Sequence, residues 1–77
     1  MVRAYVLMKI EPGKIEDVLL RLRASDHVRS ADAVTGPNDV VALVEASDPP
    51  DLADLIFRSI QTISGVKETD TRVIIEH

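Results

Sequence analysis

Two segments of the chain, 3–10 and 40–46, alternate between two faces that are both rich in apolar residues. In the first segment, Ala4, Val6, Met8 and Ile10 share one face, and Arg3, Tyr5, Leu7 and Lys9 share the other. The second segment places Val40, Ala42 and Val44 against Val41 and Leu43. A period of two residues is typical of a β-strand, and apolar residues on both faces indicate a strand covered on both sides. We therefore expect these segments to be the central strands of a sheet.

Apolar residues recur with helical spacing in two other segments. After a break at 11–13, the residues at i, i+3, i+4 and i+7 are Ile15, Val18, Leu19 and Leu22, which predicts an amphipathic helix that fades around 24–26. A second stripe consists of Leu52, Leu55, Ile56, Ile60 and Ile63. Asp48 suits the N-cap of this second helix, Pro49 suits its first turn, and Gly65 suits the left-handed position at its end.

Two outer strands complete the predicted elements. Residues 28–35 alternate imperfectly and lead into a turn, and residues 67–76 place Thr69, Thr71, Val73 and Ile75 on one face. The order is therefore strand, helix, strand, strand, helix, strand. With right-handed crossovers, this order gives a four-stranded antiparallel sheet, order 4-1-3-2, with two helices on one face. The predicted fold class is α+β, a ferredoxin-like βαββαβ sandwich.

This fold leaves one face of the sheet without helices, and the sequence makes that face apolar. The two central strands carry Tyr5, Leu7, Val41 and Leu43, or their alternates, on the uncovered side. An exposed apolar face of this size is unusual on a monomer. We expect a second copy to cover it, most simply as a two-fold dimer. The alternative is a monomer with a modestly apolar exposed sheet.

Composition narrows the class of protein. Seventy-seven residues form one domain at most, and 45% hydrophobic with 29% charged residues is ordinary globular composition. A net charge of −4 argues against electrostatic binding of nucleic acid. The absence of cysteine excludes disulfides and thiolate metal sites, and no apolar stretch approaches a membrane span or a signal peptide. We therefore expect a soluble cytoplasmic domain.

The turn Gly36-Pro37-Asn38-Asp39 is the first candidate site. Pro37 fixes φ near −65°, so Pro37-Asn38 cannot form a tight two-residue hairpin, which needs a positive φ there. A type I or II turn splays the strands and leaves backbone N–H groups near Gly36, Asn38 and Asp39 unpaired. Such amides can hold a carboxylate, and the Asp39 side chain can hold an ammonium group, which together suit a free amino acid. The alternative is a plain hairpin in which Asp39 hydrogen-bonds its own turn.

A family resemblance rests on several separated motifs. The segment V-T-G-P-N-D-V-V-A-L-V-E-A, the helix with L-x-x-L-I, and G-V-x-x-T-x-T-x-V-I-I closely resemble the ligand-sensing domain of the Lrp/AsnC family of transcriptional regulators. The opening Y-V-L-M-K-I-E-P-G-K resembles that domain's first strand and turn. The resemblance covers essentially the whole chain. Because full-length members carry an N-terminal helix-turn-helix, residues 1–77 resemble the stand-alone form, a single RAM domain without a DNA-binding domain.

The resemblance implies a site and an assembly. Members dimerise through their sheets, and the dimers commonly join into rings of four. Small effectors, usually amino acids, bind between dimers at the loop that here comprises Thr35, Gly36, Pro37, Asn38 and Asp39, and hydroxyl-bearing positions of the last strand, here Thr69 and Thr71, also contribute. The position before the aspartate is often bulky in the family and is Asn38 here, which puts a pocket for a large apolar side chain in doubt. Alternate threonines are also simply good β-formers on a half-exposed face.

No catalytic constellation is apparent, and we expect no enzyme activity. A nucleophile, base and orienting group would have to meet in a cleft, and neither His27 nor His77 has such a partner or a metal-ligand spacing. We expect no cofactor and no metal. The favoured function is a regulatory sensor that binds a small effector at an oligomer interface and acts on full-length Lrp/AsnC regulators or on metabolism. The alternatives are a small dimeric enzyme that depends on His27 or Tyr5, and a purely architectural oligomerisation module.

Overall fold

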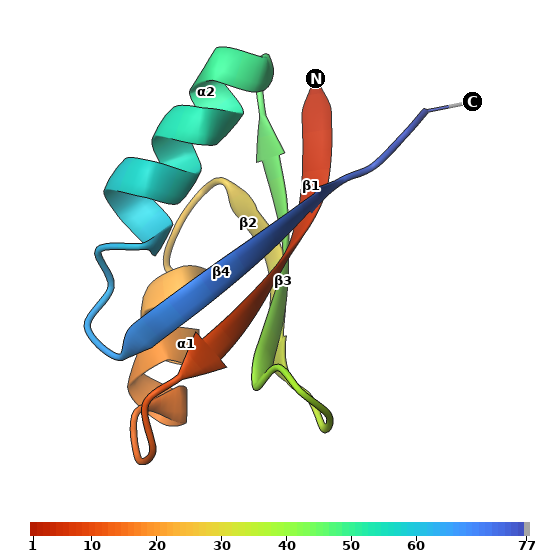
Figure 1. Cartoon of the computed structure of the whole chain (residues 1–77). Helices are drawn as coiled ribbons and strands as arrows, with labels where there is room; N and C mark the ends of the chain where they lie inside the picture. Colours follow the sequence, from red (N-terminus) through yellow and green to blue (C-terminus); the bar gives the residue numbers. More distant parts are fainter. Residues whose placement is uncertain (77) are drawn as a thin grey trace.

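The elements follow one another in the predicted order, and the computed structural model describes residues 1–76. They are β1 (Val2–Ile10), α1 (Ile15–Arg23), β2 (Val28–Ala33), β3 (Val40–Ala46), α2 (Pro49–Asp54), the π-helix η1 (Leu55–Ile60) and β4 (Val66–Val73). The strands form one antiparallel sheet in the order β2-β3-β1-β4, which is 4-1-3-2 read from the other edge. Figure 1 shows the helices on one side of this sheet. The predicted ferredoxin-like fold is confirmed.

The core lies between the sheet and the helices. In the two central strands, the helix-facing side chains are fully buried: Ala4, Val6, Met8, Val40, Ala42 and Val44. Opposite them, α1 buries Val18 and Leu22, while α2 and η1 bury Leu52, Leu55, Ile56 and Ile60. Each fully buried Val, Leu, Ile or Met side chain contributes about 1.5–3 kcal/mol by leaving water. The core is therefore aliphatic, as a chain with one Tyr and one Phe requires.

The second helical segment starts as predicted but ends early. Asp48 caps α2, because its Oδ1 accepts a hydrogen bond from the Asp51 N–H at 2.9 Å, and Pro49 occupies the first turn. The helix then widens into η1, where the Gln61 N–H donates to the Ile56 carbonyl, five residues back, at 2.8 Å. Helical structure ends at Ile60, although the sequence predicted a helix that continues to Ile63 and ends at Gly65.

Gly65 has a positive φ of +101°, but it lies beyond the helix and just before β4. A Cβ on Gly65 would sit 2.7 Å from Lys14 Cβ, so the chain at Gly65 packs directly on the start of α1. The Gly65 carbonyl also accepts a hydrogen bond from the Glu11 N–H at 2.8 Å. Glycine is needed here for a close approach between two segments as well as for backbone conformation.

The outer strands differ from the predicted ones in length. β2 ends at Ala33, two residues before the predicted end at 35, and β4 covers Val66–Val73 where 67–76 was predicted. β4 ends at Val73, which lies opposite Ala4, and the Ile74 N–H makes one further bond to the Arg3 carbonyl at 2.9 Å. In the part of the chain that the structure describes, no helix has both the length and the apolar character needed to cross a membrane.

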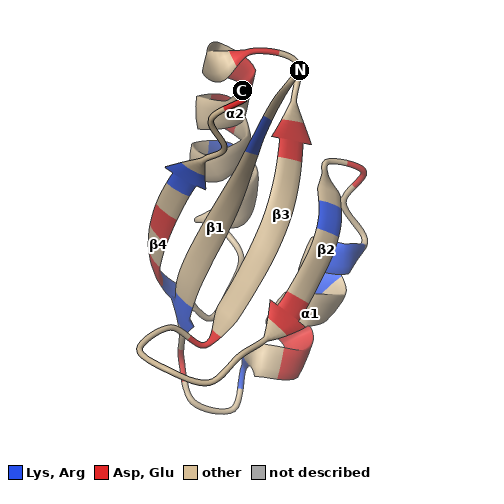
Figure 2. Ribbon diagram, turned by 90° about the vertical axis from the view of Figure 1, so that its right-hand side faces the viewer, with Lys and Arg blue, Asp and Glu red and all other residues tan. Residues whose placement is uncertain are grey.

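The uncovered face of the sheet is apolar at its centre and charged at its edges. Tyr5 is 46% exposed there, and Leu7, Val41 and Leu43 are half-buried. Figure 2 looks onto this face and shows β1 and β3 largely without charge along their middles, whereas β4 and β2 carry both signs. Ion pairs cross between strands at the margins, including Lys9 with Glu68 and Arg29 with Glu45. The sequence left two sets of residues open for the uncovered face, and the structure places Tyr5, Leu7, Val41 and Leu43 there.

Candidate functional site

The loop between β2 and β3 spans residues 34–39 and contains five of the predicted site residues. It is closed by a bond from the Val34 N–H to the Asp39 carbonyl at 2.9 Å, and it is no tight two-residue hairpin, as Pro37 predicts. Gly36 has φ +116° with open space where a Cβ would stand, so its backbone conformation, not crowding, favours glycine. Thr35, Gly36 and Pro37 are exposed, and Asn38 and Asp39 are half-buried.

Asp39 ties this loop to the end of β1. Its N–H donates to the Met8 carbonyl at 2.8 Å, and its carboxylate Oδ2 accepts from the Ile10 N–H at 2.9 Å. The reason is geometric: β3 begins at Val40, opposite Met8, so no β3 residue stands opposite Ile10 to accept its hydrogen bond. The expectation of an unpaired Asp39 amide is therefore wrong. A carboxylate has about four acceptor sites, so one bond leaves Asp39 able to accept another donor.

The loop amides of Gly36 and Asn38 differ from that of Asp39. Within residues 1–76, neither donates to a protein acceptor. Two such amides beside an anchored carboxylate place hydrogen-bond donors and a negative charge in one short segment. The loop therefore has two amides without a protein acceptor and a carboxylate with acceptor sites left, whereas the Asp39 amide is already bonded.

Thr69 and Thr71 lie on the helix-facing side of β4, opposite Met8 and Val6, and both are half-buried. Thr69 has a partner that the sequence does not reveal: its Oγ1 accepts a hydrogen bond from Gln61 Nε2 at 2.9 Å. Because Met8 pairs with Val40 on one side and Thr69 on the other, the loop and Thr69 are separated by β1, roughly 10 Å apart. Within one copy, they stand at the same end of the sheet without forming a single cavity.

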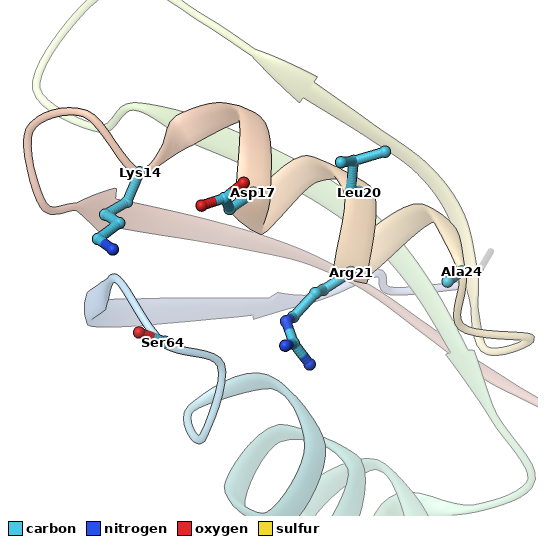
Figure 3. Close-up of a pocket in the computed structure, with 6 residues that line it drawn as sticks. All are labelled: Lys14, Asp17, Leu20, Arg21, Ala24 and Ser64. Atoms are coloured by element: carbon cyan, nitrogen blue, oxygen red, sulfur yellow. The ribbon is translucent and has the colours of Figure 1, made fainter.

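Several hollows in the surface lie away from the loop. The largest of these, about 560 Å³, lies between α1 and the segment after η1 and is lined by Lys14, Asp17, Leu20, Arg21, Ala24 and Ser64. Figure 3 shows the Lys14 amine and the Ser64 hydroxyl on opposite sides of this gap, with Arg21 pointing into it. A smaller hollow of about 240 Å³ is lined by Gln61, Val66, Lys67, Glu68 and Thr69. Only the smaller one includes a predicted site residue.

An acid with a lowered pKa, Asp70, lies on the uncovered face of the sheet. Asp70 stands opposite Leu7, and Arg72 stands opposite Tyr5. Arg72 Nη2 donates to Asp70 Oδ2 at 3.0 Å, and Arg72 Nε donates to Oδ1 at 3.1 Å. These hydrogen bonds and the positive charge of Arg72 lower the pKa of the Asp70 carboxyl and raise the pKa of the Arg72 guanidinium. This pair marks the margin of the apolar face and lies away from the loop.

His27 and Tyr5, the residues on which an enzyme would have to depend, occupy different sides of the molecule. His27 lines a hollow of about 280 Å³ with residues of β3, α2 and η1, among them Asp51 and Asp54. Tyr5 lies on the uncovered face of the sheet. The two side chains therefore share no cleft.

The family model for the Lrp/AsnC ligand binding domain matches residues 3–77. The chain belongs to this family. FFRP-DM1, a solved structure, is 32% identical with a TM-score of 0.94, and the match covers 97% of this chain and all of that one.

Two further relatives are longer proteins. An uncharacterized HTH-type transcriptional regulator of Pyrococcus horikoshii is 28% identical over 71 residues, which are 92% of this chain and 45% of that protein. A transcriptional regulator from Neisseria meningitidis, solved in complex with L-Met, shares the fold with a TM-score of 0.90 at 19% identity, over 97% of this chain and 50% of that one. The chain thus spans about half the length of each. That residues 1–77 act as a single stand-alone domain stays a prediction.

Proposed function

We propose that this domain is a regulatory sensor that binds a small effector, an amino acid, at an interface between copies of the chain. The observation that carries the proposal is the match to the Lrp/AsnC ligand binding domain over residues 3–77. The relatives from Pyrococcus horikoshii and Neisseria meningitidis are described as transcriptional regulators, and the second was solved with L-Met bound. The effector of this chain is accordingly expected to act on transcription regulators or on metabolism.

The chemistry of the loop supports an amino acid as the effector. The Gly36 and Asn38 amides can donate to an α-carboxylate, and the Asp39 carboxylate has acceptor sites left for an ammonium group. Because the Ile10 N–H holds the Asp39 carboxylate in place, this carboxylate does not have to move when it binds the ammonium group of a ligand. The loop is exposed at Thr35, Gly36 and Pro37, so a neighbouring copy must cover the ligand. In this proposal, the loop is half of a site that assembly completes.

In this proposal, the uncovered face of the sheet is the surface through which two copies of the chain associate. Tyr5, Leu7, Val41 and Leu43 form a continuous apolar centre, which a second copy would bury in a two-fold dimer. Dimers would then meet at their β2–β3 loops in a larger ring. An effector bound between two loops would favour the ring over separate dimers. Only the ring brings both halves of the site together, so only the ring makes contacts with both sides of the effector.

A second candidate function is a purely architectural module. It is favoured by the structural use of Asp39, whose carboxylate satisfies the Ile10 N–H. Isothermal titration calorimetry of the folded protein against each of the twenty amino acids separates the two candidates. A sensor gives saturable heat with at least one of them. No heat with any, from protein that is folded and oligomeric, leaves the architectural role.

A further inference from the structure

The largest hollow, of about 560 Å³, runs along one flank of α1. Four of the residues that line it follow one another at intervals of three or four positions and so share one stripe of the helix: Lys14, Asp17, Arg21 and Ala24. Ser64, in the segment between η1 and β4, stands on the opposite side of the gap (Figure 3). Among residues 1–76, neither the β2–β3 loop nor β4 contributes to the lining, so this hollow is separate from the site proposed above.

The two walls of the hollow are fastened to each other. Gly65, the neighbour of Ser64, packs so closely on the start of α1 that an added Cβ would lie 2.7 Å from Lys14 Cβ. The Gly65 carbonyl also accepts a hydrogen bond from the Glu11 N–H at 2.8 Å. The wall that carries Ser64 is therefore held against α1 by backbone contacts. The volume of the hollow lies within the range of about 300–1,000 Å³ that is typical of small-molecule sites.

Arg21 points into this hollow although an acid stands one helical turn before it. Asp17 and Arg21 have the i, i+4 spacing at which opposite charges pair on a helix. Asp54 and Arg58 have the same spacing and do pair, with Arg58 Nε 2.9 Å from Asp54 Oδ1. Within residues 1–76, no ion pair joins Asp17 to Arg21, and Figure 3 shows their charged groups directed apart. The Arg21 guanidinium is thus left free for a ligand.

Cations without a partner gather at this hollow. Of the nine Lys and Arg side chains, six form ion pairs within residues 1–76, whereas Lys14, Arg21 and Lys67 form none. Two of these three, Lys14 and Arg21, line the hollow. A chain with a net charge of −4 therefore places two unpaired cations and a hydroxyl around one space, which favours an anion there.

The donors match a phosphate monoester better than a single carboxylate. A phosphate monoester carries a charge of about −1.5 to −2 at neutral pH and has three acceptor oxygens. The planar guanidinium of Arg21 can donate two parallel bonds to two of these oxygens, and the Lys14 ammonium adds a second positive charge. Asp17, on the same stripe, repels a further anionic group but accepts from a hydroxyl. The arrangement therefore suits a phosphate attached to a neutral, hydroxylated group.

We propose that this hollow binds a small phosphate ester of a polyol, such as a sugar phosphate. Lys14, Arg21 and Ser64 donate to the phosphate, and Asp17 accepts from a hydroxyl of the same molecule. The ligand is held within one copy of the chain and is distinct from the amino acid proposed at the β2–β3 loop. The domain then responds to two kinds of metabolite through separate sites.

The test follows the Arg21 Nε–H signal and the Ser64 backbone signal by ¹H–¹⁵N NMR at physiological ionic strength. Ribose 5-phosphate is the probe, and ribose is the uncharged control. Ribose 5-phosphate should shift both signals saturably, whereas ribose should shift neither. Inorganic phosphate should bind at least about fivefold more weakly, because it lacks a sugar hydroxyl for Asp17, and D17A should remove this difference. Inorganic phosphate that binds the wild type as tightly as ribose 5-phosphate overturns the assignment of an ester.

A matched pair of variants separates a built site from general attraction to positive charge. R21Q removes a charge inside the hollow, and K67Q removes one from an unpaired lysine outside it. R21Q should weaken ribose 5-phosphate binding about tenfold or more, whereas K67Q should change it less than about twofold because a distant exposed charge is screened. Equal weakening in both folded variants, or no response of the wild type, overturns the inference. Amino-acid binding is measured separately, so either outcome leaves the proposed sensor function standing.

Discussion

The Asp39 carboxylate accepts a hydrogen bond from the Ile10 N–H at 2.9 Å, and this bond fastens the β2–β3 loop to the end of β1. The same residue donates its own N–H to the Met8 carbonyl. Asp39 therefore has a structural role before any ligand is considered. A substitution there changes the fold and the proposed site together unless the acceptor is kept.

Asp39→Ala should lower the free energy of unfolding by about 1–3 kcal/mol, because it leaves the Ile10 N–H, which is part-buried, without an acceptor. Urea denaturation followed by circular dichroism measures this difference. Asp39→Asn is the matched control, since its carboxamide oxygen can still accept from Ile10. An Asp39→Ala variant as stable as the wild type would show that water replaces the carboxylate at no cost.

Asp39→Asn also separates structure from ligand binding. The variant keeps the hydrogen bond to Ile10 and removes the negative charge proposed to hold an ammonium group. We expect near-native stability and assembly with amino-acid affinity reduced about tenfold or more, as for loss of a charge-assisted bond. Calorimetry with the amino acid that binds the wild type gives the result. Unchanged affinity in Asp39→Asn would remove Asp39 from the site.

The two glycines with positive φ should respond differently to alanine. Gly36→Ala strains only the backbone and should cost about 1–2 kcal/mol, since an added Cβ meets open space. Gly65→Ala carries the same strain and also brings its Cβ to 2.7 Å from Lys14 Cβ, so about 1–3 kcal/mol more is expected. Thermal unfolding of the two variants side by side measures the difference. Equal losses would mean that α1 shifts freely away from residue 65.

Leu43→Lys should separate the proposed dimer without unfolding the chain. Leu43 is half-buried on the uncovered face, opposite Tyr5, and it contributes nothing to the helix-covered core. A two-fold interface would bring both copies of the new charge into an apolar contact, which costs several kcal/mol. Sedimentation equilibrium should show monomer, and circular dichroism should show a native spectrum. An unaltered oligomer would place the interface elsewhere.

The Asp70–Arg72 pair predicts a small dependence of stability on pH. The pKa of Asp70 is lowered from its ordinary value of 3.8, chiefly by the hydrogen bond from Arg72. A depressed pKa in the folded state stabilises the fold above 3.8, and this contribution is lost as the pH falls through the folded-state value. Asp70→Asn should therefore be slightly less stable than the wild type at neutral pH. The difference should vanish in acid, which denaturation curves at a series of pH values can check.

The sequence predicted the sheet and both helix starts because each has an unambiguous local signal. Two-sided apolar alternation marks β1 and β3, and Asp48 followed by Pro49 marks the start of α2. The second helix was predicted too long because the stripe continues to Ile63, although η1 ends at Ile60. A widened π turn has no signature in apolar spacing, so its end was not predictable.

The loop between β2 and β3 was predicted by position, but the hydrogen bonds of its residues were not. Pro37 correctly excluded a tight hairpin, yet the partner of Asp39 is Ile10, which is distant in sequence and pairs with it only through the register of β1 and β3. Gln61 was not predicted as the partner of Thr69 for a related reason. Its contact with Thr69 depends on where the helix ends and on which face of β4 the threonine lies, and neither is encoded locally.

The central claim is that the loop is half of an amino-acid site and that assembly completes it. The most direct measurement is calorimetric titration of the wild type and of Leu43→Lys with the twenty amino acids under the same conditions. The account predicts that at least one amino acid binds the oligomeric wild type and that the folded monomeric variant binds it at least about tenfold more weakly. Equal binding by both proteins, or silence from a folded wild-type oligomer across the whole panel, would contradict it.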